Sequence, residues 1–259
     1  MKAILTDVTR CIGCEECVDA CALENGQRVN LLWRWSSKDG LSGDRFTSIV
    51  RTDAGSYVRK QCRHCLDPAC VSACPVGALT KTDTGAVVYD ADKCMGCRYC
   101  MMSCPFGIPR YTWQDSVPLI RKCTMCYESR LKEGREPACT SACPEEATIF
   151  GERDELIAEA GRRIAAEPDK YINRIYGEQD VGGTAVLYIS HEDLDVLAWS
   201  KDVGTKPLPR LTAPAMNAVL PAFFTVGAGM GLIYWITKRR ELVAESLEND
   251  KDRNVSENS

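Results

Sequence analysis

Residues 11–21 read CIGCEECVDAC and residues 94–104 read CMGCRYCMMSC, so one cysteine spacing, Cys-x2-Cys-x2-Cys-x3-Cys, occurs twice. The sixteen cysteines of the chain form four such runs within the first 143 residues. The run over residues 62–74 lengthens the middle gap to four residues, and the run over residues 123–143 lengthens it to twelve. This spacing is typical of thiolates that hold a cubane iron-sulfur cluster. The sequence therefore predicts several 4Fe-4S clusters.

The spacing has a chemical reason. Three closely spaced cysteines in a tight loop can reach three irons of one cluster, while backbone N–H groups hydrogen-bond to the sulfurs. The fourth thiolate must come from elsewhere. In two-cluster ferredoxins the last cysteine of each run ligates the other cluster, so the runs work as reciprocal pairs. Four runs satisfy this requirement.

Other uses of cysteine are weaker alternatives. Disulfide frameworks occur in short secreted chains that lack a core, whereas 259 residues can bury a core unaided. A structural zinc ion takes four ligands from two Cys-x2-Cys pairs, which leaves the third-cysteine spacing unexplained. A net charge of −4 gives no argument for a polyanionic partner, and no basic stripe indicates nucleic-acid binding.

A long apolar segment near the C-terminus differs from the rest of the chain. Residues 211–237 contain no charge, and residues 213–236 span roughly 36 Å as a helix, which is enough to cross a bilayer. Lys238, Arg239 and Arg240 follow directly, as expected at a membrane interface. We predict a transmembrane helix over residues 211–240, with a buried core helix as the alternative.

Small residues recur one helical turn apart in this segment, at Gly227 and Gly231 and at Ala218 and Ala222. Such spacing lets two membrane helices approach closely, so we expect the helix to pack against a membrane subunit. Residues 1–10 have only three adjacent apolar residues, and we expect no export signal in them.

The order of the runs predicts two nested modules. Asp83-Thr84-Gly85 is followed by the apolar stretch 86–89, which indicates a hairpin between the second and third runs. These two runs with the hairpin reproduce one complete two-cluster ferredoxin, so residues 62–104 should form an inner module. The first and fourth runs then form an outer module, residues 1–61 and 105–150, into which the inner module is inserted.

The remaining segments are predicted from local patterns. We expect short strands and loops over residues 22–61, where Trp33 and Trp35 serve either sheet packing or partner docking. Residues 151–210 should form a cap and linker. Within them, residues 152–167 have helical periodicity and residues 184–190 read as a buried strand. The polar tail, 241–259, is predicted to be disordered.

Two histidines and several basic residues leave alternatives open. His64, inside the second run, either tunes a cluster through a hydrogen bond or is an exposed loop residue. We assign His191 no role. Four basic residues lie beside the cysteines and either raise cluster potentials or are solvated surface charges; they are Arg63, Lys93, Arg98 and Lys122.

Four longer stretches carry a family resemblance: CRHCLDPACVSACPVGAL, CMGCRYCMMSCPFGIPRY, KCTMCYESRLKEGREPACTSACPEEATIFG and DVGGTAVLYIS. With the single C-terminal helix, residues 5–240 resemble the four-cluster electron-transfer subunits of membrane-bound oxidoreductases. The resemblance is strongest to the iron-sulfur beta subunits of membrane formate dehydrogenases and of periplasmic nickel-iron hydrogenases. It is weaker to those of DMSO, polysulfide and nitrate reductases. It says little about which catalytic partner is served.

The resemblance implies a ligand set for each cluster. The outer pair would use Cys11, Cys14, Cys17 with Cys143, and Cys123, Cys126, Cys139 with Cys21. The inner pair would use Cys62, Cys65, Cys70 with Cys104, and Cys94, Cys97, Cys100 with Cys74. Some relatives replace a cysteine of the third run, but this chain keeps Cys97, so four cubanes are expected. In such subunits electrons enter near the first-run cluster and leave near the third-run cluster.

We therefore expect an α+β fold of two interleaved bis-4Fe-4S ferredoxin-like modules and one transmembrane helix. The chain should relay single electrons between a catalytic subunit, with a molybdenum or tungsten pterin or a nickel-iron site, and a quinone- or haem-binding membrane subunit. No nucleophile–base constellation is readable, so we expect no substrate site. A DMSO- or polysulfide-type relay and a stand-alone iron-sulfur enzyme are the alternatives. The positive-inside rule favours a cytoplasmic C-terminus and a periplasmic cluster domain.

Overall fold

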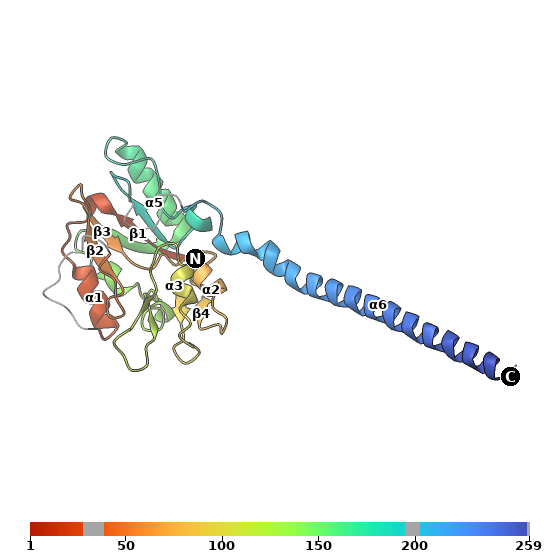
Figure 1. The fold of residues 1–259 in the computed structure, drawn as a ribbon. Coiled ribbons are helices and arrows are strands. Elements are labelled where there is room, and N and C mark those ends of the chain that lie inside the picture. Colours follow the sequence, from red (N-terminus) through yellow and green to blue (C-terminus); the bar gives the residue numbers. More distant parts are fainter. Residues whose placement is uncertain (28–38, 195–202, 258–259) are drawn as a thin grey trace. The chain divides into compact units, whose positions relative to one another are not determined.

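The computed structural model describes residues 1–27, 39–194 and 203–257, with side chains in the last segment described as far as Leu247. The chain divides into two units, Met1–Pro209 and Arg210–Ser259 (Figure 1). Trp33 and Trp35 lie outside the described residues, as does part of the linker before residue 210.

The first unit is built from short helices and strands joined by loops. Its strands are β1 Lys2–Asp7, β2 Ser48–Arg51, β3 Tyr57–Lys60, β4 Leu79–Lys81, β5 Val87–Tyr89, β6 Arg110–Tyr111, β7 Ile120–Arg121, β8 Thr148–Glu152 and β9 Val186–Ile189. Its helices are α1 Glu16–Glu24, α2 Ala69–Ser72, α3 Tyr99–Ser103, α4 Ala138–Ser141 and α5 Arg153–Ala166, and short 3-10 turns cover Val8–Arg10, Leu131–Glu133 and Asp180–Gly182.

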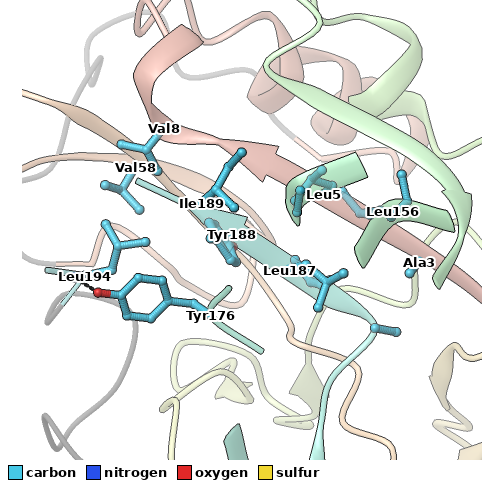
Figure 2. Packing of buried hydrophobic residues seen from close by; sticks show 14 of the residues in the cluster. Ala3, Leu5, Val8, Val58, Leu156, Tyr176, Leu187, Tyr188, Ile189 and Leu194 are labelled. Atoms are coloured by element: carbon cyan, nitrogen blue, oxygen red, sulfur yellow. Dashed lines mark hydrogen bonds between the residues drawn. The ribbon is translucent and has the colours of Figure 1, made fainter. Parts of the chain in front are cut away.

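A three-stranded sheet, in the order β8-β1-β9, holds the main hydrophobic core. β1 runs antiparallel to β8 and parallel to β9. All four residues of β9 are buried, as expected for an apolar run covered on both faces. Leu187, Tyr188 and Ile189 of β9 and Leu5 of β1 form the centre of the core in Figure 2. The strand predicted over residues 184–190 is confirmed.

Helix α5 covers this sheet with one apolar face. Leu156, Ala160 and Ile164 recur at helical spacing and are buried, and Leu156 reaches the sheet residues in Figure 2. Burying a leucine or isoleucine side chain contributes about 1.5–3 kcal/mol, so this stripe stabilises the packing of the helix on the sheet. The helix predicted over residues 152–167 is confirmed within one residue at each end.

The hairpin predicted between the second and third cysteine runs is also confirmed. β4 and β5 pair antiparallel, with Leu79 opposite Tyr89. Gly85 closes the turn with a φ of +105°, where a Cβ would lie 2.8 Å from the Lys2 carbonyl oxygen. The Lys2 N–H donates to the Thr84 carbonyl across 2.9 Å. The turn is therefore packed against the beginning of the chain, and a side chain at position 85 would clash.

Helix α6, Leu208–Glu257, begins at the end of the first unit and forms the described part of the second. Among the described residues, it supplies one stretch long and apolar enough to cross a membrane, Leu208–Leu247. The most apolar window of this stretch has no buried residues, whereas the core helix of a soluble protein is mostly buried. Large apolar side chains such as Phe223, Leu232 and Ile233 are exposed along it.

Helix α6 continues beyond Glu241, where the sequence predicted a disordered tail. The residues directly after the apolar segment, KRRELVAESL at 238–247, are mostly good helix formers and contain no glycine or proline. They extend a helix that is already nucleated, which adds one hydrogen bond per residue. The ammonium of Lys238 also pairs with the Glu241 carboxylate across 3.3 Å.

Candidate iron-sulfur cluster sites

All sixteen cysteines lie in the first unit as free thiols, so the disulfide alternative is wrong. Each run folds as a loop that leads into a short helix. The third cysteine of every run is the second residue of that helix: Cys17 in α1, Cys70 in α2, Cys100 in α3 and Cys139 in α4. These thiols lie where unpaired backbone N–H groups point outward from the first helical turn.

The loops share one unusual backbone conformation. The residue just before the second cysteine has a positive φ in every run: +72° at Gly13, +47° at His64, +73° at Gly96 and +60° at Met125. A Cβ at Gly13 would lie 2.7 Å from the Tyr57 ring, so glycine is required there. Left-handed residues other than glycine are uncommon and cluster at ligand sites, where successive N–H groups can form a concave anion-binding nest.

The thiols gather into four sets that each combine two runs. In the first set, Cys11 interacts electrostatically with Cys14 and Cys143, and Cys17 with Cys11 and Cys143. All four line one small cavity together with Ile49 and Thr148. In the second set, Cys21 interacts with Cys123, Cys126 and Cys139.

The third and fourth sets combine the second and third runs in the same way. Cys65 interacts with Cys62, Cys70 and Cys104 in the third set, and Cys100 interacts with Cys74, Cys94 and Cys97 in the fourth. Each set thus takes three thiols from one run and the last thiol from another. The packing of α1 against α4 and of α2 against α3 brings the partner runs together.

Thiols of neighbouring sets also interact electrostatically with each other, so the four sets form a row. Cys17 of the first set interacts with Cys139 of the second. Cys123 of the second set interacts with Cys62 of the third, and Cys70 of the third with Cys100 of the fourth. The four sets therefore follow one another from first to fourth.

Burial makes the free thiols hard to ionise. It raises the pKa of Cys17, Cys70 and Cys123 to about 12 and that of Cys100 to about 11. Cluster ligands must be thiolates, so the sites need compensating positive charge or hydrogen-bond donors. Backbone donors are present: the Ala78 N–H lies 3.2 Å from Cys74 Sγ and the Met125 N–H lies 3.3 Å from Cys123 Sγ.

The donor set fits an iron-sulfur cluster better than a single metal ion. Within the described residues, no three His, Cys, Asp or Glu side chains converge closely enough to hold one ion. Several buried donors near the thiols also lack an acceptor in the described chain, namely Gln61 Nε2, His64 Nε2 and the Nε and one terminal nitrogen of Arg63. The sulfurs of a cluster are acceptors of this kind.

His64 is buried, with 1% of its surface exposed, so its interpretation as an exposed loop residue is wrong. Its Nδ1 accepts a hydrogen bond from the Val87 N–H across 2.8 Å. Burial, with smaller effects from Lys122 and Lys81, holds the pKa of His64 well below its usual value. The ring is therefore neutral, and Nε2 carries the proton.

The four basic residues beside the cysteines divide into two kinds. Arg63 and Lys122 are buried, contrary to the interpretation as surface charges. The Arg63 guanidinium packs 4.3 Å from the centre of the Tyr188 ring, and Lys122 Nζ donates to the Cys123 carbonyl across 2.9 Å. Lys93 and Arg98 are exposed, as the surface interpretation requires.

Arg59 and Lys81 are two further basic residues at the cysteine sites, and the cysteine pattern does not indicate either of them. Arg59 is buried and donates to Cys139 Sγ across 2.9 Å. Lys81 Nζ donates to the carbonyls of His64 and Cys65, at 3.0 and 2.8 Å, and so supports the second-run loop. Both lie in strands outside the runs, and no local pattern distinguishes them from other strand residues that carry a charge.

Comparisons with known proteins place these sites in a family. Two models described as 4Fe-4S dicluster domain match residues 3–75 and 54–153. A protein of Nitratidesulfovibrio vulgaris is 42% identical over 93% of this chain and 68% of its own length. The hydrogenase-2 operon protein HybA of Escherichia coli O157:H7 is 35% identical over 74% of this chain and 72% of its own length. A formate dehydrogenase iron-sulfur subunit of Haemophilus influenzae is 34% identical over 87% of this chain and 80% of its own length.

Two dicluster domains imply four 4Fe-4S clusters, in agreement with the four thiol sets. The zinc alternative and the nucleic-acid-binding class are not supported by any of these relatives. The chain belongs to the family of 4Fe-4S dicluster electron-transfer subunits that includes HybA and the iron-sulfur subunits of formate dehydrogenases.

Proposed function

We propose that the chain carries single electrons along a row of four 4Fe-4S clusters, between a catalytic oxidoreductase subunit and a quinone- or haem-binding membrane subunit. The observation that carries the proposal is the linked order of the four thiol sets. The catalytic partner is of the formate dehydrogenase or hydrogenase type, as in the named relatives. The clusters supply the one-electron chemistry, and the chain fixes their order, burial and hydrogen bonding.

The proposed ligands are the four thiol sets. The first is Cys11, Cys14, Cys17 and Cys143; the second is Cys21, Cys123, Cys126 and Cys139; the third is Cys62, Cys65, Cys70 and Cys104; the fourth is Cys74, Cys94, Cys97 and Cys100. The electrostatic interactions within each set support this assignment. It is also the reciprocal arrangement of two-cluster ferredoxins.

An interleaved α+β architecture follows from these sets. The inner module, 62–104, holds the third and fourth sets around the β4–β5 hairpin. The outer module, 1–61 and 105–150, holds the first and second sets. Its two parts are joined by the pairing of β1 with β8, which supports the view that the inner module is an insertion.

Exposed apolar residues support a partner at each end of the row. Ile12 lies between Cys11 and Cys14 of the first set and is exposed, with 57% of its surface accessible. Met95, Tyr99 and Met102 are exposed beside the fourth set, with Met102 at 81%. Apolar patches at cluster sites suit docking of electron donors and acceptors. We assign the catalytic subunit to the first set and the membrane subunit to the fourth.

Helix α6 is the proposed membrane anchor. Its small residues at 218, 222, 227 and 231 suit close packing against another membrane helix. Lys238, Arg239 and Arg240 directly follow the apolar segment, and by the positive-inside rule they favour a cytoplasmic C-terminus, which we propose. The cluster unit then lies on the periplasmic side.

Purification of the intact complex tests the partner assignment. In mild detergent, the tagged chain should retain a catalytic subunit that contains a molybdenum or tungsten pterin or a nickel-iron site, together with a membrane subunit. Mass spectrometry and metal analysis identify both. Recovery of the chain without any redox partner, as an active enzyme on a small substrate, would contradict the relay proposal.

A pair of cysteine variants tests the ligand sets. Cys104→Ser should alter the cluster of the third set, although Cys104 lies in the third run, because the last cysteine of a run serves its partner. Cys74→Ser is the matched control and should alter the cluster of the fourth set. Redox-poised EPR separates the two clusters. The reverse result, with each variant disturbing the cluster of its own run, would refute reciprocal pairing.

Reporter fusions test the sidedness. With the partner subunits coexpressed, green fluorescent protein fused after Ser259 should fluoresce, because the C-terminus is proposed to be cytoplasmic. Alkaline phosphatase at the same position should stay inactive. An active phosphatase and a dark fluorescent protein would place the tail outside and the clusters in the cytoplasm.

A further inference from the structure

Arg59 is the largest fully buried side chain among the described residues, with 1% of its surface exposed. It projects from β3 and all of its guanidinium nitrogens are engaged. Nε donates to Thr47 Oγ1 at 3.2 Å, and one terminal nitrogen donates to Thr148 Oγ1 at 2.8 Å. The other donates to Gln61 Oε1 and to Cys139 Sγ, the latter at 2.9 Å. The guanidinium is thus held in one orientation.

No carboxylate compensates this charge in the described part of the chain. The partners of the guanidinium are two hydroxyls, one amide and one thiol. An isolated buried charge is costly unless an opposite charge lies close by. Although burial lowers the pKa of Arg59, the thiols of Cys139, Cys17 and Cys123 raise it above its usual value. Among the hydrogen-bond partners of the guanidinium, the Cys139 thiol is the group that becomes negative when it holds iron, so the cysteine sites supply the balancing charge.

These thiols belong to two different sets. Cys139 and Cys123 are in the second set, whereas Cys17 is in the first. Cys11 of the first set and Cys21 of the second also interact with Arg59. The side chain further lines the small cavity of the first set. One fixed cation is thus shared by two neighbouring cluster sites.

We propose that Arg59 is the shared cation that raises the reduction potentials of both outer clusters, most strongly the cluster of the second set. The proposal rests on the ligand sets assigned above. Each reduction adds one electron, supplied by the redox partner, and makes the cluster more negative by one charge. A nearby cation and a hydrogen bond to a ligand sulfur stabilise the reduced form more than the oxidised form.

The hydrogen bond explains the expected difference between the two clusters. Arg59 donates directly to Cys139 Sγ of the second set, whereas it acts on the first set through its charge. The guanidinium keeps its proton throughout, since arginine does not deprotonate in proteins. Arg59 is thus a tuning residue, and the electron moves without proton transfer at this side chain.

Redox titration of the full-length protein in detergent, monitored by EPR, tests the proposal. Arg59→Gln removes the charge, and Arg59→Lys keeps the charge but loses the planar fork. In Arg59→Gln the reduction equilibrium of the second-set cluster should become at least about tenfold less favourable, which lowers a one-electron potential by about 59 mV. The first-set cluster should shift less in the same direction, and the two inner clusters should not shift. Arg59→Lys should give smaller shifts.

Arg162→Gln is the matched control, because the Arg162 side chain is 75% exposed on α5 and pairs with Glu159 on the same helix. It should leave all four potentials unchanged. Iron is measured first in every variant. Full iron content with four unchanged potentials in Arg59→Gln would overturn the proposal, as would an equal fall of all four.

If Arg59→Gln loses iron, the Arg59→Lys variant distinguishes tuning of the potential from a role in cluster assembly. A lowered potential of the second-set cluster in Arg59→Lys would support tuning. Four unchanged potentials, or loss of iron in this variant as well, would mean that Arg59 is needed for cluster assembly and does not tune the potentials. Either negative result leaves the proposed relay function standing, provided that the wild-type chain shows four 4Fe-4S signals. Absence of those signals from the wild-type chain would instead refute the proposed function.

Discussion

Thiols from distant parts of the chain converge in the first unit, and the rest of the unit depends on this convergence. Cys143 meets Cys11, and Cys21 meets Cys123, across more than a hundred residues. Such closure requires the two ends of the cysteine region to lie side by side, which the pairing of β1 with β8 provides. The cysteines of the two inner runs are much closer in sequence and come together around the β4–β5 hairpin. A compact inner module can therefore be inserted without disturbing the outer one.

Charge compensation is the second constraint. The buried thiols have raised pKa values, so they bind a cluster only if their conversion to thiolates is compensated. Arg59, Arg63 and Lys122 are buried close to them, and none has a carboxylate partner among the residues described. The cations and the clusters therefore compensate each other. Folding of the cluster unit and assembly of its cofactors are coupled for the same reason.

Short sequence patterns predict many of the secondary-structure elements and the cysteine sites of this chain. Cysteine spacing, the Asp83-Thr84-Gly85 turn, the periodicity of α5 and the apolar run of β9 each predict an element or site from adjacent residues. The burial of Arg59 and His64 could not be predicted, because it arises from segments that are distant in sequence. The polarity of residues 241–259 predicts disorder, but glutamate, arginine and leucine also favour helix, and α6 continues to Glu257.

Analysis of iron, acid-labile sulfide and zinc in the purified full-length chain measures directly whether the chain holds four 4Fe-4S clusters. Four 4Fe-4S clusters require about sixteen irons and about sixteen sulfides per chain, with negligible zinc and a broad visible absorption that bleaches with dithionite. About four zinc ions per chain, with no sulfide and no visible absorption, would show that the four thiol sets hold zinc and not iron-sulfur clusters.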